Sequence, residues 1–237
     1  SINDEFARVM DVNAHARKIS KAVLTKRRIA DSASKILVWV DNGGDDSAIP
    51  ALTTNAVEKN FDKYCNLFEQ GRDVSKAIIK AIQNKPAAEQ AKMIQGRMDK
   101  AGAKKHLYYP VLAATGAKEA VAPIVEGYKS STGEAQKSAF EGLCALNDAS
   151  VLPTLLEATA NAELKDKAIA RYITLTGTSA INNDQKYMNY RKALETNPAL
   201  KYKNQALKAL SATQNYQAMM LAAEYMDNAE TAQAAAN

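Results

Sequence analysis

The nine residues Leu112-Ala-Ala-Thr-Gly-Ala-Lys-Glu-Ala120 return in a looser form as Leu210-Ser-Ala-Thr-Gln-Asn-Tyr-Gln-Ala218. They lie inside a longer self-similarity between residues 90–140 and residues 185–237, in which the offset drifts from 95 to 98 residues. Such self-similarity is the signature of architectures built from stacked structural repeats. The sequence therefore predicts a repetitive fold.

A shorter repeat is marked by proline. Three apolar runs, 48–52, 121–125 and 151–155, each carry a proline in the middle, and Pro123 and Pro153 are 30 residues apart. Repeat periods of about 20 to 50 residues indicate solenoids, propellers or other arrays. Proline in the first turn of a helix costs no hydrogen bond, so each run is interpreted as the start of a helix.

Composition favours an all-α chain. Of the 237 residues, 46% are hydrophobic but only 6% are aromatic. Alanine, the best helix former, dominates the apolar class. Residues 35–40 could form a strand, but they also extend a helical pattern that glycine closes at Gly43 and Gly44. We expect a helix there.

Hydrophobic spacing predicts a series of helices joined by short connections from about residue 28 onward. The expected helices cover residues 28–40, 46–61, 61–70, 73–83, 86–101, 104–115, 118–129, 134–146, 150–160, 163–176, 184–195, 200–212 and 216–226. Asp46 and Ser47 are expected to cap the second of them. We expect one domain over residues 1–237, with a less regular basic section at 1–27 and repeats over 28–237. The last repeat stops short, so we also expect the parent polypeptide to continue past Asn237.

The unit formed by a polar cap, an early proline and a second helix of small and aliphatic residues resembles the HEAT-like family of helical repeats. The segments 46–52 and 148–156 carry the first helix of this pattern, and Ala168, Tyr172 and Leu175 carry the second. The resemblance implies a right-handed α-solenoid of antiparallel helix hairpins, an armadillo-type superhelix whose wall binds protein partners. The chain departs from strict HEAT units in lacking an evident ladder of buried arginine and aspartate.

A narrower resemblance concerns residues 190–195, 205–211 and 218–229. These stretches look like the helical repeat regions that precede a jelly-roll domain of the 3-keto-disaccharide hydrolase type in exported bacterial proteins. That resemblance implies a periplasmic or cell-envelope protein that acts on carbohydrate through another domain. No hydrolase residue is transferred to this chain, since it contains no jelly roll.

Candidate chemical groups are sparse. His15 and His106 have no ligand partner at metal-binding spacing and are interpreted as structural. Cys65 and Cys144 lie among apolar residues, which favours buried free thiols over a disulfide or a reactive thiol. We therefore assign no catalytic, cofactor-binding or metal-binding residue, and the binding residues stay unknown.

The acidic, glycine-rich loop at residues 41–46 could suggest calcium. An EF-hand-like loop would need an acidic ligand at the twelfth position, which is Leu52. A helix stop followed by a capping residue explains the loop better.

Charge gives the main alternative. Net charge is +5, and the first 30 residues hold seven Lys/Arg against three Asp/Glu. Arg17, Lys18, Lys21 and the run 26–28 could touch phosphates, and some HEAT-like solenoids are DNA glycosylases. Trp39, the sole tryptophan, follows the apolar face of its helix and is expected in the core, which leaves no stacking platform for a base.

The favoured prediction is a non-catalytic scaffold or protein-interaction module without cofactors. Its partner would be another protein or an adjacent domain of the same polypeptide, with nucleic acid disfavoured. No apolar stretch reaches the roughly 18 residues that a membrane span needs. The alternative is an enzyme, either a DNA glycosylase-like solenoid or a lyase with a site in the groove.

Overall fold

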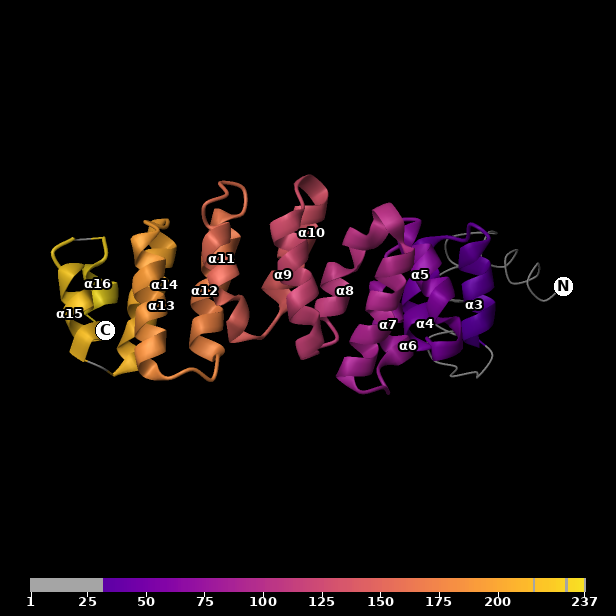
Figure 1. The fold of residues 1–237 in the computed structure, drawn as a ribbon, viewed down its shortest axis with the longest axis horizontal. Coiled ribbons are helices and arrows are strands. Elements are labelled where there is room, and N and C mark those ends of the chain that lie inside the picture. The colour runs from indigo at the N-terminus through magenta and orange to yellow at the C-terminus, as the bar shows by residue number, and fades with distance from the viewer. Residues whose placement is uncertain (1–31, 215, 229, 237) are drawn as a thin grey trace. The chain divides into compact units, whose positions relative to one another are not determined.

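The computed structural model describes residues 32–214, 216–228 and 230–236 (Figure 1). These residues form fourteen α-helices, six short 3-10 helices and no strand. The predicted all-α class is confirmed. The basic section before residue 28, including His15, lies outside the described residues.

The chain divides into two compact units, Ser1–Ala120 and Val121–Asn237. In the described part of the first unit the helices pack against near neighbours in the sequence: α5 packs against α6, and α4 packs against α3 and against α6, the next helix but one. Its α-helices are α3 (Ser32–Asp41), α4 (Ile49–Thr54), α5 (Phe61–Glu69), α6 (Ser75–Ile82), α7 (Ala87–Lys100) and α8 (Tyr109–Ala113). Tyr64, Ile78 and Leu112 are among its fully buried side chains.

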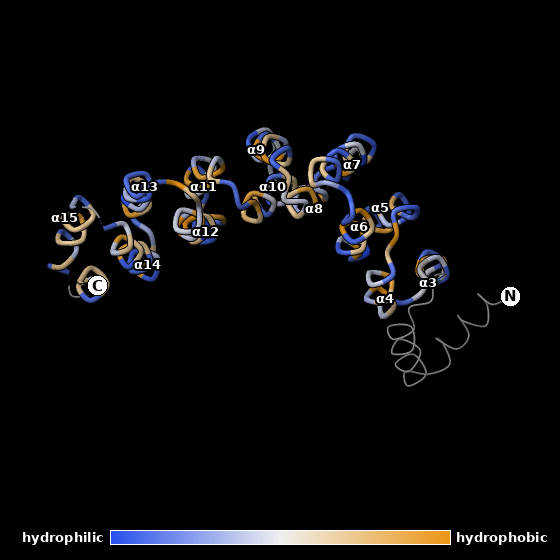
Figure 2. The backbone as a smooth tube through the Cα atoms, turned by 90° about the horizontal axis from the view of Figure 1, so that it is seen from below, coloured by the Kyte–Doolittle hydropathy of each residue, from blue (hydrophilic) through white to orange (hydrophobic). Residues whose placement is uncertain are grey.

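The second unit consists of longer helices that pack in pairs, α9 with α10, α11 with α12 and α13 with α14. Figure 1 shows the last pair lying side by side. The helices are α9 (Val121–Ser130), α10 (Gly133–Ala145), α11 (Leu152–Ala158), α12 (Lys165–Thr178), α13 (Asn183–Glu195), α14 (Leu200–Leu210), α15 (Tyr216–Glu224) and α16 (Ala232–Ala235). Hydrophobic and hydrophilic residues share these helices, as amphipathic segments require (Figure 2).

Helix starts in both units use a 3-10 turn and an early proline. Proline is the second residue of α4 (Pro50), α8 (Pro110) and α11 (Pro153), and the third residue of α9 (Pro123). Each of these helices directly follows a 3-10 helix. Proline fits there because its fixed backbone angle suits the first turn and its missing N–H would have no partner. The sequence interpretation recognised three of these starts and missed the one at Pro110.

Two predicted helices were wrong in detail. The helix expected over 46–61 ends at Thr54, because the Asn55 side chain donates to the carbonyl oxygen of Ala51 and Val57 is extended. The stretch expected as α-helix from Lys104 is a 3-10 helix, η3 (Gly102–Tyr108), that leads into α8. Apolar spacing cannot separate the two helix types, since both bring residues i and i+3 together.

The self-similar stretches end a helix in the same way. The Thr115 hydroxyl donates to the carbonyl oxygen of Leu112 at 2.7 Å, and Gly116 then takes a left-handed φ of +66°. At the aligned positions the Thr213 hydroxyl donates to Leu210 at 2.7 Å, and Gln214 has a φ of +49°. Left-handed backbone is uncommon outside glycine. The aligned positions therefore share an unusual local structure as well as similar residues.

Candidate functional site

The most connected polar cluster lies in the first unit, where Arg97 of α7 reaches the end of α5. Its Nε donates to Glu69 Oε1 at 2.7 Å, and its Nη2 donates to Glu69 Oε2 at 2.9 Å and to Asn66 Oδ1 at 2.6 Å. The Tyr108 hydroxyl donates to Glu69 Oε1 at 2.6 Å. The Arg97 and Glu69 side chains are only 15% and 18% exposed. Every oxygen of the carboxylate therefore has a donor.

The protonation of this cluster is fixed at neutral pH. Desolvation raises the pKa of Glu69, but the hydrogen bonds from Arg97 and Tyr108 outweigh it and hold the pKa below its ordinary value. Burial, followed by the hydrogen bond to Glu69, raises the pKa of Tyr108 far above its ordinary value. A general acid or base needs a pKa near the working pH. The cluster is therefore built to hold helices together and not to move protons.

The glycine-rich loop at residues 41–46 is also structural. Asp45 caps the 3-10 turn η1 (Asp46–Ala48) by accepting from the Ser47 N–H, so the cap is Asp45 and not the predicted Asp46 and Ser47. Asp46 instead accepts from Arg72 Nε at 2.5 Å, and Arg72 also donates to the carbonyl oxygen of Gly44 at 2.7 Å. Asp45 and Asp46 thus both have partners within the protein. No group of three metal-ligating side chains occurs among the residues that the structure describes.

Trp39 lies in the core as predicted, with 7% of its surface exposed. Its ring packs against Gly44, where an added Cβ would lie 2.4 Å from the indole. Only glycine fits at that position. The single tryptophan is thus used in closing the loop after α3 and presents no face for stacking on a base.

Charged residues of the second unit pair both within helices and between elements. Lys137 lies 3.9 Å from Glu134 within α10, and Arg191 lies 2.9 Å from Glu195 within α13, at the i+3 and i+4 spacings that favour such pairs. Other pairs join different elements. Lys129 lies 3.6 Å from Glu157, Lys137 lies 3.0 Å from Glu163, and Lys167 lies 2.5 Å from Glu141. The six side chains of these three pairs are about half exposed or more. Such exposed pairs contribute little stability.

The thiols and the described histidine have structural surroundings. Cys65 is buried and Cys144 is half-buried, and both are free. Burial raises the pKa of each to about 11, so the reactive thiolate is scarce at neutral pH. Nδ1 of His106 lies 2.9 Å from the carbonyl oxygen of Ala103 and donates to it.

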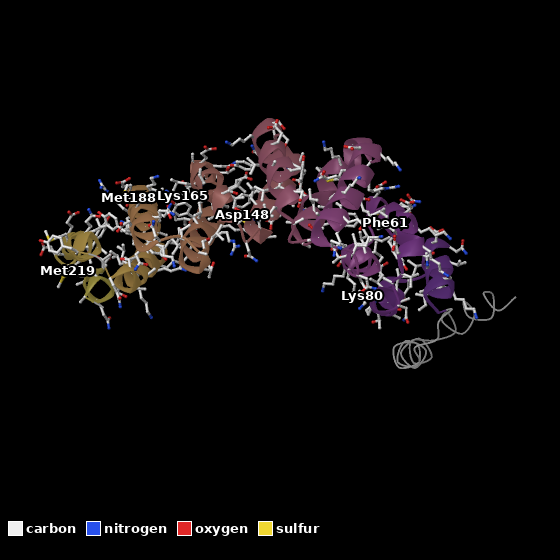
Figure 3. The ribbon with its side chains drawn as sticks, turned by 60° about the horizontal axis from the view of Figure 1, so that its bottom comes forward. Phe61, Lys80, Asp148, Lys165, Met188 and Met219 are labelled. Carbon is white, nitrogen blue, oxygen red and sulfur yellow. The ribbon has the colours of Figure 1, made fainter. Side chains whose placement is uncertain are left out.

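The first unit has an open surface cavity of about 420 Å³ that we call the α6 groove. It lies between α4, α6 and α8, and its floor is aliphatic. Nine residues line it: Thr53, Ser75, Lys76, Ile79, Lys80, Gln83, Pro110, Val111 and Ala114. Lys80 is labelled in Figure 3.

Sequence reasoning missed this groove although one signal was present. Ile78 and Ile82 lie on the buried face of α6, one turn apart, whereas Ile79 is half-buried. A neighbouring position is rotated by about 100° around a helix, so Ile79 cannot share the stripe of Ile78. The sequence signal of the groove is therefore an isoleucine, Ile79, that lies beside the buried stripe and between Lys76 and Lys80.

The second unit holds two larger cavities and one of similar size. The α15 pocket, of about 620 Å³, is lined by parts of α14, α15 and α16 and includes Met219 and Met226. These two methionines are 62% and 50% exposed. A further cavity of about 620 Å³ lies between the start of α11 and α13 and includes Met188 (Figure 3). It is continued by a smaller one of about 410 Å³ that reaches Tyr172 and Glu157.

Comparison of the chain with protein-family models, with curated proteins and with solved structures finds no match in any of the three. The resemblance to HEAT-like repeats thus identifies no family, and the structure shows an all-helical protein with many short helices. No described helix combines the length and the apolarity that crossing a bilayer requires.

Proposed function

We propose that this chain is a non-catalytic protein-interaction module built from HEAT-like helical repeats. One observation carries the proposal. Each of the four cavities described above has aliphatic or methionine side chains in its lining, and none of them brings together two carboxylates or contains a histidine or a cysteine. Open grooves of this composition suit the apolar side chains of a protein partner.

The α-solenoid is part of this proposal. Packing against sequence neighbours, proline-marked helix starts and the matching ends at Thr115 and Thr213 support it. In a solenoid each repeat contacts chiefly the next one, and extended binding surfaces result. The partner would be another protein or an adjacent domain of the same polypeptide. From the narrower resemblance alone, we place the module in an exported bacterial protein that acts on carbohydrate through another domain.

The proposal is tested by site-specific photo-crosslinking in the source cells. A photoreactive amino acid replaces Ile79 in the α6 groove, Met219 in the α15 pocket, or Lys63, an exposed residue of α5 outside these cavities. We expect Ile79 or Met219 to yield a defined protein adduct, identified by mass spectrometry, that Lys63 does not yield. Equal labelling at all three positions, or adducts with nucleic acid alone, would overturn the proposal.

A further inference from the structure

The α6 groove combines an aliphatic floor with unneutralised positive charge. Ile79, Pro110 and Val111 form the floor, and Val111 is almost fully buried. Lys76 and Lys80 line the groove, and both are exposed. No carboxylate lines this groove among the residues that the structure describes.

Lys76 and Lys80 differ from Arg72 and Lys85, the two cations near them that have carboxylate partners. Lys85 lies 3.0 Å from Glu58 and 2.9 Å from Glu89, and Arg72 bonds Asp46. Within the described part of the chain, Lys76 and Lys80 form no ion pair. They stand one turn apart on α6, a spacing at which like charges repel. An acidic ligand would relieve this repulsion.

Charge is distributed unevenly along the chain. The described residues of the first unit carry 13 Lys/Arg and 10 Asp/Glu, whereas the second unit carries 11 and 12. The first 30 residues add a further excess of four positive charges. A net positive charge favours association with an acidic partner.

The lining favours a protein segment over nucleic acid. Single strands are held by aromatic stacking platforms, and no aromatic side chain lines the α6 groove. An aliphatic floor is instead typical of sites that receive the apolar face of a helix. We propose that the α6 groove binds an acidic amphipathic helix of the partner protein, whose aliphatic side chains cover Ile79 and Val111 while its carboxylates pair with Lys76 and Lys80. This inference rests on the interaction role proposed above and specifies the chemistry of the partner.

The test uses the full chain and three labelled probes. The first is a designed 16-residue amphipathic helix with leucines on one face and glutamates beside them. The second carries lysine at each glutamate position, and the third is duplex DNA. Binding is measured by fluorescence anisotropy at low and at moderate salt. We expect the acidic helix to bind, with an affinity that falls as salt rises, and the basic helix to bind at least tenfold more weakly.

The decisive variant is Lys76→Glu/Lys80→Glu. Its matched control is Lys59→Glu/Lys63→Glu, which reverses two exposed lysines at the same spacing outside the groove. We expect the groove variant to lose at least tenfold in affinity for the acidic helix and to gain affinity for the basic one. The control should stay within about twofold of the wild type, and circular dichroism establishes that both variants are folded. A third variant, Ile79→Ser, which removes aliphatic surface without changing charge, should weaken binding of the acidic helix and leave its salt dependence unchanged.

Equal losses in the groove and control variants would overturn the inference, because they would show only a general charge effect. Failure of the acidic helix to bind, or tighter binding of DNA that the groove variant abolishes, would overturn it too. The photo-crosslinking result separates these failures from that of the interaction role. A neutral or basic protein crosslinked at position 79 would leave that role intact and refute only the acidic partner.

Discussion

Each unit links two helices through an arginine side chain, but the groups that accept its hydrogen bonds differ. In each, an arginine reaches the end of an earlier helix: Arg97 reaches α5 in the first unit and Arg171 of α12 reaches α10 in the second. Arg97 meets a carboxylate with two of its nitrogens. Arg171 meets only neutral acceptors, the carbonyl oxygen of Leu146 and the amide oxygen of Asn147, and its buried Nε has no partner. In the first unit the linkage is therefore an ion pair whose carboxylate responds to pH. In the second unit the arginine bonds only neutral acceptors, which do not.

Removing each arginine is the strongest test of this comparison. Arg97→Met leaves the largely buried Glu69 carboxylate without its main partner, and we expect a loss of about 2–3 kcal/mol in the free energy of unfolding. Arg171→Met removes hydrogen bonds to neutral groups and should cost about 1 kcal/mol. Urea unfolding followed by circular dichroism measures both. Similar losses would show that the carboxylate adds nothing to the linkage.

The second difference between the units is expected in how their stability responds to acid. Because the folded-state pKa of Glu69 lies below its unfolded value, its contribution to stability is complete above the ordinary pKa of about 4.3. That contribution is lost as pH falls through the folded-state pKa. Glu69→Gln should therefore flatten the decline of the urea midpoint below about pH 4, whereas Arg171→Met should leave the decline unchanged. An unchanged slope in Glu69→Gln would contradict the assignment.

The aligned helix ends offer a pair of opposite backbone tests. Gly116→Ala forces a β-carbon into the left-handed region at φ +66°, where no atom lies within 4 Å to compensate or to clash. We expect a loss of about 1 kcal/mol from backbone strain alone. Gln214→Gly removes the same strain from the second copy and should gain about 0.5 kcal/mol, since glycine also makes the unfolded chain more flexible. Thermal unfolding of both variants checks the sign of each change in stability. A loss of stability in Gln214→Gly would show that the Gln214 side chain makes a stabilising contact that outweighs the backbone strain.

The smallest effect is expected at the surface ion pairs of the second unit. Lys167→Gln breaks the contact with Glu141, in which both side chains are about half exposed, and should cost no more than about 0.5 kcal/mol. Raising the salt concentration should reduce even this difference. A loss as large as that of Arg97→Met would mean that the exposed pairs act as a network.

The sequence predicted helices well and their interruptions poorly. The apolar residues Val74, Ile78, Ile79 and Ile82 predict α6 without knowledge of any other helix, because periodicity depends on one segment alone. Their assignment to one face was wrong for Ile79, which is half-buried beside the others. The break after Thr54 depends on the Asn55 side chain, which bonds the carbonyl oxygen of Ala51, and also on Tyr64, whose hydroxyl oxygen accepts from the Val57 N–H at 3.3 Å. The contact with Tyr64 has no local pattern that could predict it.

The candidate site was less predictable than the fold. Arg97 and Glu69 are 28 residues apart, and nothing between them indicates that they pair. The α6 groove exists because α8 packs beside α6 and leaves Ile79 half-covered, so it is a property of packing and not of any motif. The lack of a recognisable reactive motif in the sequence led to the predicted interaction role. The location of the binding surface could be proposed only from the structure.

The packing of each helix against its sequence neighbours has a kinetic consequence. Contacts between near neighbours close only short stretches of chain, so little loop entropy is lost before a native contact forms. Proteins with this property fold among the fastest of their size. During synthesis a hairpin such as α9 and α10 can dock as soon as its own residues have emerged, before the helices that follow exist. In hydrogen-exchange experiments the same arrangement predicts opening in segments of a few adjacent helices, each with its own free energy.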